Sequence, residues 1–186
     1  MNENTHMKSA LIISVFVFLT GLFAGIFFST GLSEANVELL GKLLASSISD
    51  SSKGALNVLT SSLITNMGPA LIMISAVISR FLCPLPLLIL LYKSFAVGFC
   101  SSLIYISGYE HAFLASLIKV FPHNAVLVPT FIVLAAFTFY ASRSALCKSK
   151  RSSRKRKDLG KIILIALAAI ATGCIAEALC SMIEVL

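Results

Sequence analysis

The chain has 186 residues, of which 58% are hydrophobic and only 12% are charged. Soluble domains carry about 25% charged residues, so this composition excludes an ordinary soluble domain. Apolar runs of about 20 residues recur, which is the length that a helix needs to cross a bilayer. A transmembrane β-barrel would show alternation over segments of about ten residues instead. The sequence therefore predicts an all-α, polytopic membrane helical bundle.

The net charge of +7 is concentrated in one place, because nine of the fifteen Lys and Arg residues lie between Arg143 and Lys161. Loops rich in Lys and Arg stay on the cytoplasmic side of a membrane. We therefore expect 143–161 to be a solvated cytoplasmic loop. Such a loop attracts anionic lipid headgroups. It lacks the interleaved aromatic residues that would suggest a nucleic-acid partner, so none is expected.

Five spans are expected within one membrane domain that covers residues 1–186. They lie at about 9–29, 63–78, 87–106, 124–142 and 162–182. Five crossings from a cytoplasmic N-terminus put the C-terminus outside. The same alternation puts the link at Arg80 inside, and it puts the segment 31–61 and the turn 108–111 outside.

The first span is too long for the core of a signal peptide, and we expect it to be retained. It contains Gly21 and Gly25, a GxxxG pattern that permits close approach of two helices. The pattern also occurs by chance in membrane helices. A contact within the chain, a homodimer face and no contact all remain open.

The segment 31–61 is more polar than its neighbours. Its apolar residues repeat near helical spacing after Ser33, a possible N-cap; they are Val37, Leu40, Leu44 and Ile48. The pattern predicts an amphipathic helix, which either lies on the membrane surface or packs on the bundle. The following span is short and is broken near its start by Asn66, Gly68 and Pro69.

Residues 112–121 are mostly apolar but too few to cross a bilayer, so we expect a half-helix or re-entrant segment that carries Lys119. Pro122 suits the first turn of the next helix, where its missing N–H costs nothing. Pro129 would kink that helix. Backbone breaks inside a bilayer survive only where protein or trapped water satisfies the freed groups, so this segment belongs to the packed interior.

Charged residues inside the spans are the candidate functional positions. An intramembrane charge costs about 2.5–3.5 kcal/mol and usually finds a partner in the bundle. Glu177 in the last span could pair with Lys119 or with Lys93. Lys93 could instead extend to the cytoplasmic interface. In the proline-rich break, His123 is either a proton-handling group or a hydrogen-bonded structural residue beside Asn124.

Nothing in the sequence indicates catalysis. No nucleophile, phosphate-binding or metalloprotease motif is present, and the three histidines are too scattered for a metal site. The five cysteines show no metal-binding spacing and are expected to pack as small apolar side chains. We therefore expect no enzyme activity, no cofactor and no metal.

Three pieces of the chain stand out, in this order: Tyr92-Lys-Ser-Phe-Ala-Val-Gly-Phe99, Val120-Phe-Pro-His-Asn-Ala-Val-Leu-Val-Pro129 and Gly173-Cys-Ile-Ala-Glu-Ala178. Together they resemble the stage II sporulation protein M family of integral membrane proteins. The middle piece, with its two prolines, is the most specific. The short segment between the first two spans and the basic run at 147–157 depart from the family pattern.

This resemblance implies a non-enzymatic membrane scaffold of the engulfment machinery in sporulation. Its implied partners are peptidoglycan-degrading enzymes, which it would localise at the septal membrane. A different function remains open from the residues alone. Lys93, His123, Asn124 and Glu177 could line a polar route in a small-solute or ion transporter or channel, because broken helices are typical of transporters. The absence of an internal repeat weighs against that alternative.

Overall fold

The computed structural model describes residues 3–49, 55–77, 80–107, 121–146 and 153–181. In these ranges every regular element is helical, and the expected all-α class is confirmed. The elements are α1 (Glu3–Thr30), α2 (Glu34–Ser49), α3 (Ala55–Ser75), the short 3₁₀ helix η1 (Arg80–Leu82), α4 (Leu85–Ile106), α6 (Phe121–Leu146) and α7 (Ser153–Ser181).

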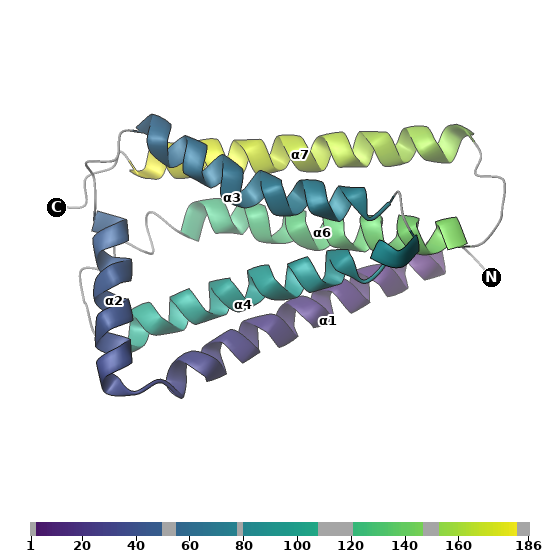
Figure 1. Cartoon of the computed structure of the whole chain (residues 1–186). Helices are drawn as coiled ribbons and strands as arrows, with labels where there is room; N and C mark the ends of the chain where they lie inside the picture. Colours follow the sequence, from purple (N-terminus) through teal and green to yellow (C-terminus); the bar gives the residue numbers. More distant parts are fainter. Residues whose placement is uncertain (1–2, 50–54, 78–79, 108–120, 147–152, 182–186) are drawn as a thin grey trace.

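Among the described residues, five long helices run lengthwise between the two ends of the molecule, and α2 crosses one of those ends (Figure 1). The chain alternates between the ends. The start of α1, η1, the end of α6 and the start of α7 lie at one end. The end of α1, the end of α4 and the end of α7 lie at the other, with α2. This is the alternation that five crossings require.

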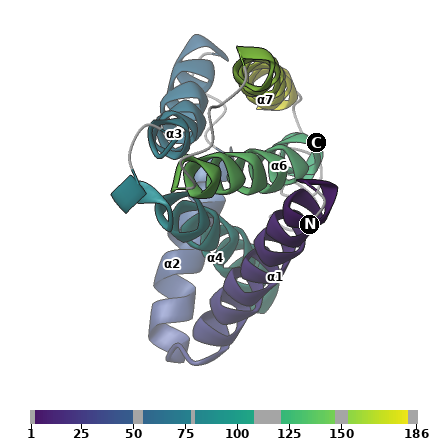
Figure 2. The same cartoon turned by 90° about the vertical axis from the view of Figure 1, so that its right-hand side faces the viewer.

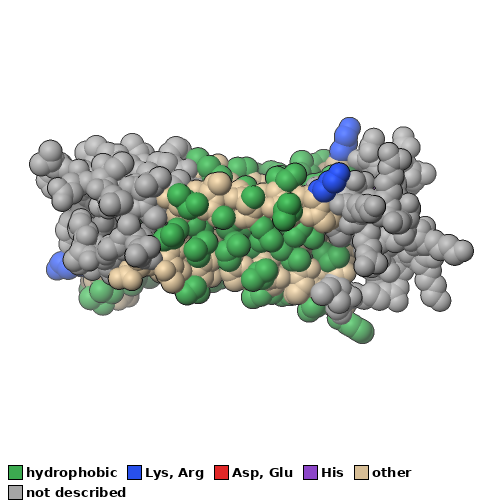
Figure 3. Space-filling model, turned by 90° about the horizontal axis from the view of Figure 1, so that it is seen from above, with side chains coloured by type: hydrophobic (Ala, Val, Ile, Leu, Met, Phe, Trp, Pro, Cys, Tyr) green, Lys and Arg blue, Asp and Glu red, His purple; other side chains and the backbone are tan. Residues whose placement is uncertain are grey.

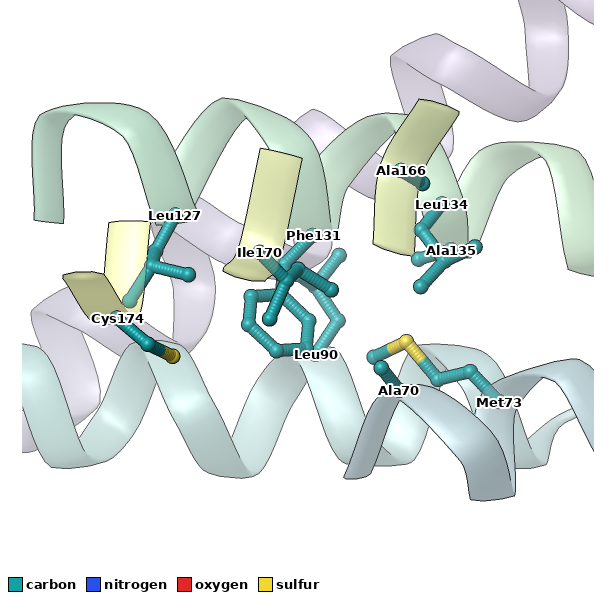
Figure 4. Packing of buried hydrophobic residues seen from close by; sticks show 10 residues of the cluster. All are labelled: Ala70, Met73, Leu90, Leu127, Phe131, Leu134, Ala135, Ala166, Ile170 and Cys174. Carbon is teal, nitrogen blue, oxygen red and sulfur yellow. The ribbon is translucent and has the colours of Figure 1, made fainter. Parts of the chain in front are cut away.

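The helix α6 lies in the middle of the bundle, and α1, α3, α4 and α7 surround it and contact it (Figure 2). Its buried apolar residues are Leu127, Phe131, Leu134 and Ala135, which belong to the main cluster, and Ala136 and Ala141. Ile170 of α7 and Leu90 of α4 belong to the same buried cluster, as Figure 4 shows. Spacing of three and four residues places the cluster residues of α6 on one side of the helix. Ala136 is buried on the opposite side, as a core helix surrounded by other helices requires.

The GxxxG pattern on α1 is a contact within the chain. Both Gly21 and Gly25 are buried against α4. A Cβ atom at Gly25 would collide with the carbonyl oxygen of Phe95, and one at Gly98 would collide with the carbonyl oxygen of Leu22. Small residues let the two backbones approach closely, which strengthens packing in a membrane, where no hydrophobic force joins helices. The pattern is therefore used inside the chain.

Large apolar side chains cover much of the lengthwise surface. Figure 3 shows a hydrophobic band along the middle, with Lys and Arg side chains only toward the ends of the visible face. Three described helical segments are long and apolar enough to cross a membrane: His6–Thr30, Leu85–Ile106 and Asn124–Arg143. Two shorter apolar segments, Leu59–Ser75 and Ile163–Ile175, accompany them. The chain is a helical membrane bundle.

Helix bounds differ from the expected segments in two places. α3 begins at Ala55, so the last part of the segment 31–61 belongs to the second lengthwise helix rather than to a surface element. α6 continues to Leu146 and α7 begins at Ser153, so residues 143–146 and 153–161 of the expected basic loop are helical, and residues 147–152 lie outside the described residues. Lys and Arg are good helix formers, so a helix can extend beyond its apolar part into water. Amino-acid composition alone identifies only the apolar part of such a helix.

The helix that the sequence predicts after Ser33 is present in the structure as α2. The helix starts directly after Ser33, whose carbonyl accepts hydrogen bonds from the N–H groups of Asn36 and Val37. The expected half-helix at 112–121 and the turn at 108–111 lie outside the described residues, apart from Phe121, which begins α6.

Candidate functional site

Lys93 of α4 donates two hydrogen bonds to α3. Its Nζ lies 2.9 Å from the carbonyl oxygen of Thr65 and 2.8 Å from Oδ1 of Asn66. The same Nζ lies 5.4 Å from the centre of the Phe131 ring of α6. A cation within about 6 Å of an aromatic face is attracted by the ring. The ammonium group is therefore held by two oxygens of α3 and attracted by a ring of α6.

Asn66 connects this lysine to the rest of the bundle. A lysine ammonium only donates, so the amide oxygen of Asn66 faces it and the amide nitrogen faces away. That nitrogen donates to the carbonyl oxygen of Ser62 at 3.0 Å and to its Oγ at 3.3 Å. It also lies 3.8 Å from Sγ of Cys174 on α7. We call Lys93, Thr65, Asn66, Ser62, Cys174 and Phe131 the Lys93 cluster.

The Lys93 cluster lies within the apolar part of the bundle. Asn66, Ser62 and Cys174 are buried, and Lys93 is half-buried. Lys93 lies eight residues after Leu85, the first residue of α4, or about 12 Å along the helix at about 1.5 Å per residue. Hydrogen bonds to a charged group contribute about 1.5–3 kcal/mol each, which is comparable to the cost of about 2.5–3.5 kcal/mol of an intramembrane charge. The cluster can therefore hold a charged lysine at this depth.

The remaining expected site residues are spread along α6 and α7. Pro122 and His123 are the second and third residues of α6, Asn124 follows half-buried, and Pro129 lies inside the same helix. Glu177 is on α7, three residues after Cys174. Lys119 lies outside the described residues.

Of those expected residues, only Lys93 has described contacts in the cluster. Its described hydrogen-bond partners, Thr65 and Asn66, were not among the expected site residues. The sequence nevertheless contains a signal for them, which is the proline at position 69. A proline inside a helix frees the carbonyl four residues before it, and Asn66 directly follows the residue that carries this carbonyl.

No group of three or more His, Cys, Asp or Glu side chains that could hold a metal ion occurs among the described residues. At the end of the bundle that carries α2, Lys42 forms an exposed ion pair with Glu38, one turn earlier on the same helix. The hydrogen bond from Lys42, together with its charge, holds the pKa of the Glu38 carboxyl below its usual range.

Comparison with known families gives the assignment. The family model described as Stage II sporulation protein M matches residues 14–182. The chain belongs to the stage II sporulation protein M family. The match confirms the resemblance drawn from the three sequence pieces. No curated protein and no solved structure matches the chain.

Two of the three stage II sporulation protein M pieces meet in the Lys93 cluster. Tyr92–Phe99 on α4 supplies Lys93, and Gly173–Ala178 on α7 supplies Cys174. Asn66 of α3 lies between them. The first piece also supplies Gly98, which is packed against α1. These family segments thus contribute to helix–helix contacts on both sides of the bundle.

Proposed function

We propose that this protein is an integral membrane scaffold of the sporulation engulfment machinery, localising peptidoglycan-degrading enzymes at the septal membrane. The observation that carries the proposal is the family match over residues 14–182, which marks a sporulation membrane protein. The stage II sporulation protein M family is not a known enzyme family. The partner enzymes, and not this protein, would then degrade the peptidoglycan.

The polar groups of the site support this proposal through the contacts they make. Lys93 and Asn66 use their donors and acceptors to hold α3, α4 and α7 together. Such hydrogen bonds stabilise the packing of the helices, and a rigid bundle suits a protein that positions partner proteins. Reaction with a substrate would instead need groups poised to exchange protons or form bonds.

Orientation is part of the proposal. The end with exposed Lys8, Arg143 and Lys161 would face the cytoplasm, since basic residues stay inside. α2 and the C-terminus would then face outward, on the side where peptidoglycan lies. On α2 the side chains of Leu39 and Leu43 are exposed, which makes this helix the described element best placed to contact a partner outside the membrane.

The test is a crosslinked pull-down from sporulating cells, with the protein as bait. We expect the eluate to contain peptidoglycan-degrading enzymes and to clear peptidoglycan in a zymogram. The variant Leu39→Glu/Leu43→Glu should lose this activity at an unchanged bait level. The matched control, His6→Glu/Gly160→Glu, adds the same two charges at exposed positions near the opposite end of the bundle from α2. Bait that recovers no wall-degrading activity would overturn the proposal.

Transport is the other outcome to be measured. Protein reconstituted in vesicles should move no ion or small solute, and Glu177→Gln and Lys119→Met should lower protein level or partner recovery without changing any flux. A flux through the wild-type protein that Glu177→Gln abolishes would establish a transporter or channel instead.

A further inference from the structure

Pro69 interrupts the backbone hydrogen bonds of α3 at a defined place. In a regular helix the N–H of residue 69 would donate to the carbonyl of residue 65, and proline has no N–H. The oxygen left without this donor is therefore that of Thr65. In a bilayer an unsatisfied backbone group costs several kcal/mol, because no water is available to bind it.

Lys93 donates to that same oxygen. Its Nζ lies 2.9 Å from the Thr65 carbonyl, and the hydroxyl of Thr65 is engaged separately with the carbonyl of Ser61 at 2.8 Å. The ammonium of α4 thus stands in for the amide hydrogen that Pro69 removes from α3. The second acceptor of the ammonium, Asn66, is the next residue of α3.

The position matters for the shape of α3. Figure 1 shows this helix changing direction along its length, and prolines are the commonest cause of such bends. The part before Pro69 leads from the end that carries α2, and the part after it leads toward η1. Whatever holds the interrupted turn therefore holds the direction of the first part of α3 relative to α4.

We infer that Lys93 is a positioning residue that completes the interrupted hydrogen-bond ladder of α3 from outside the helix, so that Lys93 and Pro69 act as one coupled pair. Lys93 is needed because Pro69 is present. When the proline is replaced by alanine, the backbone supplies its own donor to Thr65, and the lysine loses that task.

A double-mutant cycle tests this coupling on the purified full-length protein in lipid nanodiscs. The variants are Lys93→Met, Pro69→Ala and both together. The single variant Lys93→Met and the double variant both lose the contact of Lys93 with Asn66, so this loss cancels in the cycle. The remaining difference reports the hydrogen bond from Lys93 to the Thr65 carbonyl. We expect Lys93→Met to lower the folding equilibrium constant about three- to ten-fold more in the wild-type background than in the Pro69→Ala background, the range of hydrogen bonds between membrane helices.

The matched control uses the other helix-interior proline. Pro129→Ala in α6 should leave the effect of Lys93→Met unchanged, because the carbonyl freed by Pro129 belongs to a different helix. Equal effects of Lys93→Met in the wild-type and Pro69→Ala backgrounds would overturn the inference. Should Lys93→Met fail to accumulate, the readout becomes protein level: recovery by Pro69→Ala supports the coupling, and no recovery contradicts it.

A second readout reports position instead of stability. Spin labels on introduced keto amino acids at Asn57 and Tyr105, both exposed, measure the distance from the start of α3 to the end of α4. We expect Lys93→Met to shift or broaden this distance distribution only when Pro69 is present. An unchanged distribution would contradict the positioning role. These measurements need no partner, so a failed pull-down leaves them unaffected, and the reverse holds as well.

Discussion

The side-chain nitrogen of Asn66 on α3 lies 3.8 Å from the sulfur of Cys174 on α7, although 108 residues separate the two in the sequence. The oxygen of the same amide accepts a hydrogen bond from Lys93 on α4. One buried amide thus connects three of the five lengthwise helices.

Replacement of Asn66 tests that connection. Asn66→Leu keeps the branched shape and the number of side-chain heavy atoms but removes the acceptor of Lys93 and the donor to Ser62, so we expect the free energy of unfolding to fall by about 1–3 kcal/mol. Unfolding in detergent by urea measures it. The control Asn57→Leu changes an exposed residue of the same helix and should cost little. Equal losses of unfolding free energy in the two variants would show that the buried amide contributes no more to stability than the exposed one.

The α1–α4 contact predicts a steric effect. Gly25→Leu should push the two helices apart, because a side chain there meets the backbone of Phe95, and overpacking costs about 1–3 kcal/mol or more. Gly160→Leu on α7 is the matched control, because a Cβ there meets nothing within 4 Å. Thermal unfolding of the monomer measures the difference in stability between these two variants. A Gly25→Leu protein of normal monomer stability that has lost a dimer would instead identify a homodimer face.

Topology can be determined by cysteine labelling in intact cells. Asn36→Cys on α2 should react with a membrane-impermeant maleimide, and Gly160→Cys near the start of α7 should react only after permeabilisation; both positions are exposed. The parent protein controls for native cysteines. The reverse pattern would invert the bundle in the membrane, and labelling of both positions in intact cells would contradict the five-crossing arrangement.

The Glu38–Lys42 pair predicts a pH effect confined to α2. Because the pKa of Glu38 is lowered in the folded state, the contribution of the pair to helix stability is present above the ordinary pKa of a glutamate and is lost as the pH falls through the lowered value. Intrinsic amide exchange also changes with pH, so protection factors of α2 are the quantity to compare, and they should fall at acidic pH. Lys42→Met should raise the pKa of Glu38 in an NMR titration and remove the pH dependence of protection. Unchanged titration would show that the pair is not formed in solution.

Composition and periodicity were sufficient for the class of fold, because apolar length and clustered basic residues depend on the bilayer and not on detailed packing. The contact of Gly25 with α4 was one of three open alternatives, since a GxxxG pattern permits close approach without specifying which helix approaches. The described partners of Lys93 were not foreseen. Charge considerations offered Glu177 as one possible partner, and the side chain of Glu177 lies outside the described part of the structure. The backbone oxygen freed by Pro69 carries no charge, so a search for charged partners passes over it.

The central place of α6 has a consequence for how the protein is made. This helix contacts α1, α3, α4 and α7, yet it is the fourth of the five lengthwise helices to leave the ribosome. During membrane insertion α1 and α4 can already join through their glycines, whereas the contacts of α3 with α6 and α7 form only after those helices have been made. The core helix is therefore added late, with only α7 to follow, and a translational delay before residue 121 would leave a partly assembled, proteolysis-prone intermediate in the membrane.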